Sequence, residues 1–272
     1  MKRRTFLIAL GAAACHTSDP PLGFARSLLG VARAAGELSS ADERFASQEL
    51  TRIRRLAEPM LRGASIDTAA QTLSELLFER LGFVREVTST SLSFVILPTV
   101  LRERRGSCVG LGTLMLALCE ACGVSANGVL MPGHFYVQLG DAAHTRNMEM
   151  LRRGEAMPEA WYRERFPIPG GEAHEYARPL SRVEALGVVE YDVGGERRRQ
   201  QRLDEARAAY ARAIRAFPGF AAAHASLGTT LHLLGHLDEA AASYERARKL
   251  DPQLPGVAWN RSLLESERAS PY

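Results

Sequence analysis

The C-terminal third of this 272-residue chain contains an internal repeat whose period restricts what this part can fold into. Leu203-Asp204-Glu205-Ala206 recurs as Leu237-Asp238-Glu239-Ala240, at an interval of 34 residues. Further pairs keep the same interval: Tyr210 and Tyr244, Ala213 and Ala247, Pro218 and Pro252, Gly194 and Gly228. A period of this length indicates paired helices that bury their apolar faces only against neighbouring pairs. We therefore expect an all-α stack here.

The repeated pattern resembles the tetratricopeptide repeat. Two units are recognisable, and Val257 to Arg268 is expected to form a capping helix after them. Two such units rarely stand alone, so we expect them to pack against the domain that precedes them. The resemblance implies a protein partner, docked on the concave face of the repeats.

The N-terminus has the composition of an export signal. Met1-Lys2-Arg3-Arg4 is positively charged, and Thr5 to Ala14 is short, apolar and ends in small residues. Arg3-Arg4-Thr5-Phe6-Leu7 resembles the twin-arginine signal, which carries folded proteins across the bacterial inner membrane. Cys15 resembles the acylated cysteine of bacterial lipoproteins, although Ala12 stands where such sites usually carry Leu. We expect an exported, periplasmic protein of the bacterial envelope, either lipid-anchored at Cys15 or cleaved without lipidation.

Composition and charge argue against several other classes of function. The apolar fraction of 46% and charged fraction of 24% are those of a globular protein. No apolar run reaches the ~20 residues of a membrane span. The net charge is only +3, and Arg197-Arg198-Arg199 reads as a solvated helix face rather than a nucleic-acid site. Neither a metal-ligand spacing nor a glycine-rich phosphate loop is present, so we expect no metal and no cofactor.

With Cys15 assigned to processing, the chain has three further cysteines, Cys108, Cys119 and Cys122. Cys119 and Cys122 lie within one apolar helical pattern, and no second pair completes a zinc site. We expect both to be packing residues, with a strained local disulfide as the alternative. Five histidines are expected on the surface or in the repeat helices: His144, His174, His224, His232 and His236.

The middle of the chain combines helical and strand-like patterns. Residues 1–15 read as the signal, and 16–39, rich in Pro, Gly and Ala, as a linker. Helical spacing follows in 40–60, 68–81 and 108–122, around an extended or irregular segment at 83–98. Strands are expected at 124–131, 135–139 and 145–151. A helix followed by an antiparallel meander predicts an α+β domain over 40–182, ahead of the all-α repeat domain at 183–272.

Within that domain, three residue positions follow the order of a thiol active site. Cys108 opens the apolar helix, where unpaired N–H groups and the positive end of the helix dipole favour a thiolate. His134 follows a Pro-Gly turn and is a candidate base for the thiol proton. Asn147 and Glu149 lie two apart on a strand and share one face, so either could orient the imidazole. The backbone N–H of Cys108 is the expected first oxyanion donor.

These residues also carry a family resemblance. Arg105-Gly106-Ser107-Cys108, Pro132-Gly133-His134-Phe135 and Asn147-Met148-Glu149 resemble the bacterial transglutaminase-like family with trailing tetratricopeptide repeats. That family belongs to the papain-like superfamily of cysteine acyl-transfer folds. Trp161 to Arg165 shares the resemblance, which extends from about residue 40 to the C-terminus. It implies Cys108 as the nucleophile and His134 as the base. For the third residue, which orients the base, it implies Glu149, where relatives carry Asp, with Asn147 as the second choice.

Two functions from different classes follow from the resemblance. The first is an exported, thiol-dependent amide hydrolase or acyltransferase acting on a peptide or protein substrate or on cell-wall material. The second is a catalytically silent envelope scaffold or adaptor that binds proteins through its repeats, because members of this fold can lack the cysteine.

Overall fold

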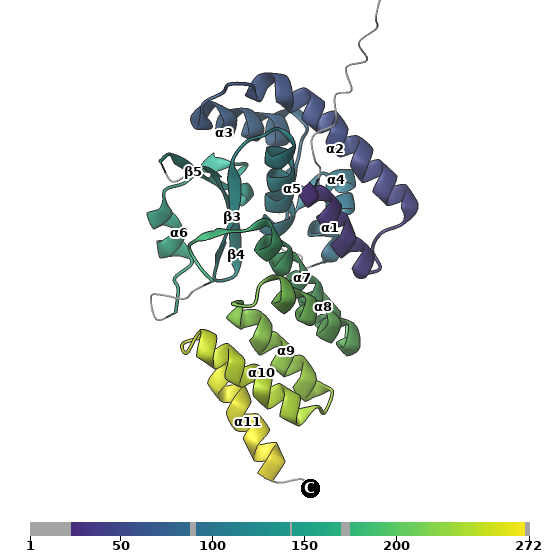
Figure 1. Cartoon of the computed structure of the whole chain (residues 1–272), viewed down its shortest axis with the longest axis vertical. Coiled ribbons are helices and arrows are strands. Elements are labelled where there is room, and N and C mark those ends of the chain that lie inside the picture. Colours follow the sequence, from purple (N-terminus) through teal and green to yellow (C-terminus); the bar gives the residue numbers. More distant parts are fainter. Residues whose placement is uncertain (1–22, 88–90, 142, 170–174, 270–272) are drawn as a thin grey trace, which may run out of the picture.

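The computed structural model describes residues 23–87, 91–141, 143–169 and 175–269 (Figure 1). An α+β domain is followed by a stack of helices that ends at the C-terminus, so the predicted fold class is confirmed. The expected export signal and Cys15 lie outside the described residues, as does His174. No helix in the described ranges combines the length and apolar character needed to cross a membrane.

The predicted linker at residues 16–39 was wrong for most of its length, because it contains helix α1 (Gly23–Ala34). Phe24, Leu28 and Ala32 recur every four residues and are buried in the core. The backbone N–H of Phe24 donates to the Glu120 carboxylate at 2.7 Å. The small residues of this segment thus belong to a packed helix rather than to a tether.

The helices of the α+β domain surround one almost completely buried member. Capped by Ser39, α2 (Ser40–Leu61) is followed by α3 (Ile66–Ser74), which continues as a π-helical turn. The short α4 (Leu97–Glu103) leads to α5 (Cys108–Ala121), which is buried on nearly all sides.

The segment predicted to be extended or irregular, residues 83–98, is described at 83–87 and 91–98, where short elements alternate with irregular residues. It holds the short strand β1 (Val84–Arg85) and a 3-10 turn (Leu92–Phe94). Strand β1 pairs in parallel with β2 (Arg105–Gly106) directly before α5.

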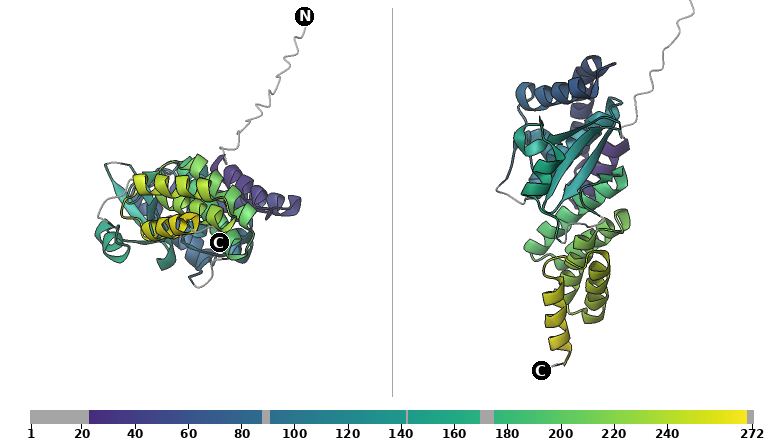
Figure 2. Two further views of the ribbon diagram at one scale, coloured as in Figure 1. Left: turned by 90° about the horizontal axis from the view of Figure 1, so that it is seen from below. Right: turned by 90° about the vertical axis from the view of Figure 1, so that its left-hand side faces the viewer.

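The sheet is antiparallel with the order β6-β5-β4-β3-β7. Its centre is the predicted meander: β3 (Ala126–Met131), β4 (His134–Gly140) and β5 (Thr145–Glu149). Two short strands complete the edges, β6 (Glu155–Ala156) and β7 (Pro179–Leu180). The right-hand view of Figure 2 shows the strands of the sheet above the helices of the repeat stack.

One aromatic ring sets the distance between α5 and the sheet. The Phe135 ring lies between Gly112 on α5 and Gly128 on β3. A Cβ at Gly112 would come within 2.7 Å of this ring, and one at Gly128 within 2.3 Å. Both contacts are closer than a methyl group permits, so glycine is required at each position. Since Phe135 adjoins His134, this packing also fixes where His134 stands relative to α5.

The repeat region forms two helix pairs and a cap, as predicted. The pairs are α7 (Arg182–Arg199) with α8 (Leu203–Ala216), and α9 (Ala221–Leu233) with α10 (Leu237–Leu250). The capping helix is α11 (Val257–Ala269).

The repeated glycines and tyrosines make the same contact in both units. A Cβ at Gly194 would stand 2.7 Å from the Tyr210 ring, and a Cβ at Gly228 would stand 2.7 Å from the Tyr244 ring. Each tyrosine is almost completely buried. The 34-residue interval therefore reflects the same glycine–tyrosine contact in both repeats.

The first repeat shares the hydrophobic core of the α+β domain, which confirms the expected packing. Val188 and Phe217 belong to the same buried cluster as Leu114 of α5. Arg197 is only 3% exposed and bonds Glu37 at 2.6 Å, tying α7 to the end of α1. The prediction that all three consecutive arginines form a solvated face was therefore wrong for Arg197.

Candidate active site

Cys108 begins helix α5, and local contacts hold this helix end in place. The Ser107 side chain accepts a hydrogen bond from the Gly110 N–H at 3.2 Å, a typical N-cap. The Ser107 N–H donates to the Phe94 carbonyl at 2.8 Å. A Cβ at Gly110 would lie 2.1 Å from that carbonyl oxygen, so this close approach requires glycine.

His134 begins strand β4 and is held on both sides. Its Nε2 lies 2.7 Å from Oε2 of Glu149, with side-chain exposures of 3% and 1%. The imidazole stacks on Phe166 at 4.1 Å with an interplanar angle of 8°. Since a carboxylate only accepts hydrogen bonds, Nε2 carries a proton in this contact, and Nδ1 is left as the proton acceptor of the neutral ring.

Of the two candidates for the third position, the contact with the imidazole falls on Glu149. Its second oxygen, Oε1, accepts the Leu151 N–H at 2.9 Å, so both carboxylate oxygens are engaged. Asn147 bonds Gln138 instead, at 2.9 Å. The cause is the strand register, which places Gln138 directly opposite Asn147. The structure therefore brings His134 and Glu149 together and leaves Asn147 outside the contact.

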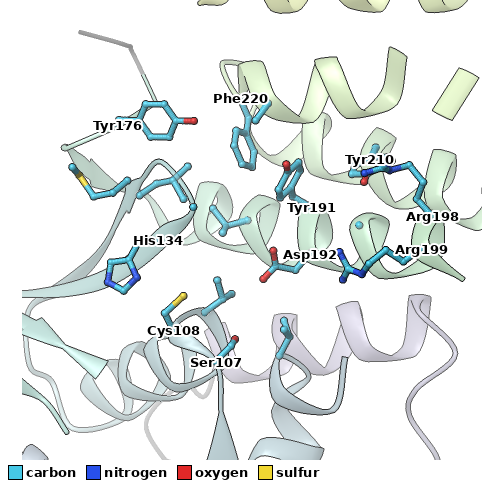
Figure 3. Close-up of a pocket in the computed structure, with 18 residues that line it drawn as sticks. Ser107, Cys108, His134, Tyr176, Tyr191, Asp192, Arg198, Arg199, Tyr210 and Phe220 are labelled. Carbon is cyan, nitrogen blue, oxygen red and sulfur yellow. The ribbon is translucent and has the colours of Figure 1, made fainter. Parts of the chain in front are cut away.

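Figure 3 shows Cys108 and His134 next to each other at one end of a cavity. Both side chains line this cavity. The Cys108 sulfur is also in hydrogen-bonding contact with the backbone N–H of Phe135, the residue directly after His134. Thiol and imidazole, predicted as nucleophile and base, thus face the same cavity.

The electrostatics of the resting thiol bear on the sequence-based expectation. Burial raises the pKa of Cys108 to about 12, and the charges of Asp192 and Glu149 act in the same direction. The N–H groups of Phe135 and Val109 act in the opposite direction but do not outweigh burial. The expectation that the helix N-terminus favours a thiolate stays a prediction, because burial acts against it. A raised pKa favours the neutral thiol, so a reaction at the sulfur needs a base that takes the proton.

Asp192 is a site residue that the sequence analysis missed. It lies on α7 in the first repeat, and in Figure 3 its carboxyl group projects into the cavity beside Cys108. Burial raises its pKa to about 7, although the charge of Arg199 opposes the rise. No local pattern marks this residue, because only the packing of the repeat on the α+β domain brings it to the thiol.

The cavity has a volume of about 340 Å³, within the range of small-ligand sites. One wall comes from the start of α5 and the turn before β4, and the other from α7, Tyr210 of α8 and the start of α9. Tyr176, Tyr191 and Phe220 supply aromatic surface. The site therefore belongs to both parts of the chain.

The Trp161–Arg165 segment lies behind the imidazole. It forms most of helix α6 (Glu159–Arg165). Tyr162 is completely buried and stacks on Tyr136 at 3.8 Å, while Trp161 meets Tyr162 edge-on at 5.0 Å. These rings, with Phe166, shield the His134–Glu149 pair from water.

The other cysteines and histidines in the described part of the chain do not line this cavity. Cys119 is buried in the core and Cys122 is partly buried, and both are free thiols. His144 and His232 pair with Asp67 and Glu267 on the surface. Within the described ranges, no cluster of potential metal ligands occurs.

The fold and site define the class of protein: an α+β cysteine–histidine–carboxylate domain joined to helical repeats. A family model for the transglutaminase-like superfamily matches residues 44–185, so the chain belongs to this superfamily. A tetratricopeptide-repeat model matches residues 194–255. No match was found among curated proteins.

Similarity to solved structures is more distant. Among the matches is a structure titled "Crystal structure of menin reveals the binding site for Mixed Lineage Leukemia (MLL) protein". It has a TM-score of 0.45 and 12% sequence identity, and the match covers 84% of this chain. This chain spans 65% of the length of that menin chain.

Proposed function

We propose that the protein is a thiol-dependent amide hydrolase or acyltransferase, with Cys108 as nucleophile and His134 as general base. The observation that carries the proposal is the convergence of three groups: a thiol at a helix N-terminus, a buried imidazole beside it, and a carboxylate 2.7 Å from the far imidazole nitrogen. This is the arrangement of nucleophile, base and orienting group that acyl transfer requires.

In the proposed reaction, Nδ1 of His134 takes the thiol proton as the sulfur attacks the amide carbonyl. The sulfur–carbon bond forms, the carbon–nitrogen bond then breaks, and the imidazolium returns the proton to the leaving amine. Water or a second amine attacks the resulting thioester and regenerates the thiol. Glu149 stabilises the positive imidazolium that exists between the two proton transfers.

The charge on the carbonyl oxygen requires a donor. The backbone N–H of Cys108 stands at the first position of α5, where N–H groups have no partner within the helix. We assign it to the oxyanion of the tetrahedral intermediate. The repeats, whose class commonly binds proteins, would dock the substrate protein or a partner.

We also propose that the protein is exported to the bacterial envelope. The charged and apolar stretches of residues 1–14 support this proposal, and Cys15 is the candidate for a lipid anchor.

The test of the proposed chemistry is a stoichiometric burst with an activated ester such as p-nitrophenyl acetate. We expect about one equivalent of p-nitrophenolate per protein, and none from Cys108→Ala. Adding an amine such as glycinamide separates transfer from hydrolysis, because an acyltransferase forms the new amide in competition with acid.

A silent scaffold is the second candidate, and the raised pKa of Cys108 is the observation that favours it. In that case the wild-type protein and the Cys108→Ala variant give the same slow release without a burst. Binding of a protein partner through the repeats would then be unaffected by Cys108→Ala.

A further inference from the structure

Three consecutive arginines end helix α7, and they have different surroundings. Arg197 is buried against Glu37, and Arg199 bonds Glu196 at 2.8 Å. Arg198 lies between them, and within the described part of the chain no carboxylate pairs with it. Its Nε is buried without a hydrogen-bond partner. The residue as a whole is half-buried, and a charged group without a described acidic partner favours an anionic ligand.

Arg198 lines the same cavity as Cys108. The residues of α7 on this wall recur with helical spacing: Val188, Tyr191, Asp192, Gly195, Arg198 and Arg199. In Figure 3 the Arg198 side chain lies at the end of the cavity far from His134, near Tyr210. The cavity thus has a reactive thiol at one end and a guanidinium at the other.

We propose that this cavity binds an acyl substrate whose carboxylate is held by Arg198. A guanidinium binds a carboxylate with two parallel hydrogen bonds, stronger than those between neutral groups. The inference rests on the proposed function for one point only, that the carbonyl to be attacked lies at Cys108.

The chemistry of the walls supports a short peptide-like ligand. Tyr191 and Phe220 meet at 4.9 Å between the two ends of the cavity and offer apolar surface to a chain. Asp192 stands close to the thiol, at the end where the amide nitrogen would lie. The carboxylate belongs to the opposite end, where Arg198 is the group without an acidic partner among the described residues.

Two sources supply the same carboxylate chemistry: the C-terminus of a peptide and an acidic side chain. The test measures binding by calorimetry to the full chain carrying Cys108→Ala, which prevents turnover. The probes are N-acetyl-dialanine and N-acetyl-trialanine as free acids and as C-terminal amides. A third kind of probe is amidated and carries its only carboxylate on a glutamate side chain.

We expect at least one acid to bind about tenfold or more tightly than its matched amide, the factor of one charge-assisted hydrogen bond. Arg198→Gln should abolish the difference, whereas Arg198→Lys should keep part of it. Arg246→Gln, an exposed arginine of α10 outside the cavity, should preserve it fully. The kind of probe that binds more tightly, a C-terminal acid or a glutamate side chain, then identifies the substrate class.

Equal binding of acids and amides, or a preference that survives Arg198→Gln, overturns the inference. Neither result depends on the thiol, so this outcome is separate from a failure of the proposed chemistry, which the ester burst detects.

Discussion

The substitution Glu149→Gln tests the role of the buried imidazole–carboxylate pair most sharply. Glu149 accepts two hydrogen bonds, from Nε2 of His134 at 2.7 Å and from the Leu151 N–H at 2.9 Å. A glutamine side chain has one acceptor oxygen and therefore cannot satisfy both. If its NH₂ group faces Nε2, the imidazole proton is displaced to Nδ1, where the ring can no longer take the thiol proton.

The magnitude follows from the loss of a charged hydrogen bond. Hydrogen bonds to charged groups contribute about 1.5–3 kcal/mol, and this one strengthens when the imidazole becomes positive. Acylation of Cys108 should therefore slow by roughly tenfold to 150-fold. The thiol responds in the opposite sense: the Glu149 charge helps to raise the pKa of Cys108, so the pKa falls when that charge is removed. A slower acylation with a lower thiol pKa distinguishes this mechanism from general damage to the fold.

Acylation is measured as the rate of the p-nitrophenyl acetate burst, and the thiol pKa as the pH dependence of Cys108 alkylation by iodoacetamide. Asn147→Ala is the matched control, because the Asn147 side chain bonds Gln138 rather than His134. This variant should keep the acylation rate within about twofold of wild type and leave the thiol pKa unchanged. An acylation rate of Glu149→Gln within twofold of wild type would refute the reasoning. So would an equally large loss in Asn147→Ala.

Four further substitutions probe the site and the packing around it. Asp192→Asn should lower the pKa of Cys108, because a carboxylate beside the sulfur is removed; an unchanged alkylation profile would contradict the placement of Asp192. Glu175, whose carboxylate accepts the Ala221 N–H at 3.1 Å, has a pKa raised by burial to about 7. Because the pKa of Glu175 is higher in the folded than in the unfolded protein, the free energy of unfolding falls as pH rises from about 4.5 to about 7. This loss of stability is at most about 3 kcal/mol. Glu175→Gln should remove it, as measured by urea titrations at pH 5 and 8. Gly194→Ala should destabilise the protein by about 1–3 kcal/mol, because the added methyl group meets the Tyr210 ring. At Gly195 the nearest atom lies 3.5 Å from an added Cβ, so Gly195→Ala should stabilise the helix. Equal melting temperatures of the two variants would argue against this packing.

The parts of the fold that sequence patterns predicted are those with a local or periodic cause. The 34-residue interval predicted both repeats because the contact of Gly194 with Tyr210 recurs as that of Gly228 with Tyr244. The meander was predicted because its strands are short apolar runs bounded by turn residues. Helix α1 was missed because its many glycines and alanines also suit a linker, and only tertiary burial of Phe24 decides between the two.

The residues of the candidate site also divide into those predicted from local sequence and those that depend on the assembled fold. Cys108 and His134 were identified from their own neighbours in sequence, and the strand alternation narrowed the third position to Asn147 or Glu149. The choice between these two depends on the register with β4, which no local pattern specifies. The contribution of Asp192 to the cavity comes from the packing of the first repeat on the α+β domain.

The pKa of the Cys108 thiol also depends on the assembled fold. A helix N-terminus is visible in sequence, but the burial that outweighs it at Cys108 is a property of the assembled fold.

The central claim is that Cys108 and His134 act together, and mass-spectrometric mapping of the trapped acyl group tests it most directly. After a brief exposure to p-nitrophenyl acetate, the account predicts a thioester on Cys108 and not on the partly buried Cys122, which serves as the internal control. In His134→Ala, formation of this thioester should slow by about a hundredfold or more, the contribution of a general base. Acylation of Cys108 at the same rate without the imidazole, or no thioester on Cys108 at all, would contradict the account.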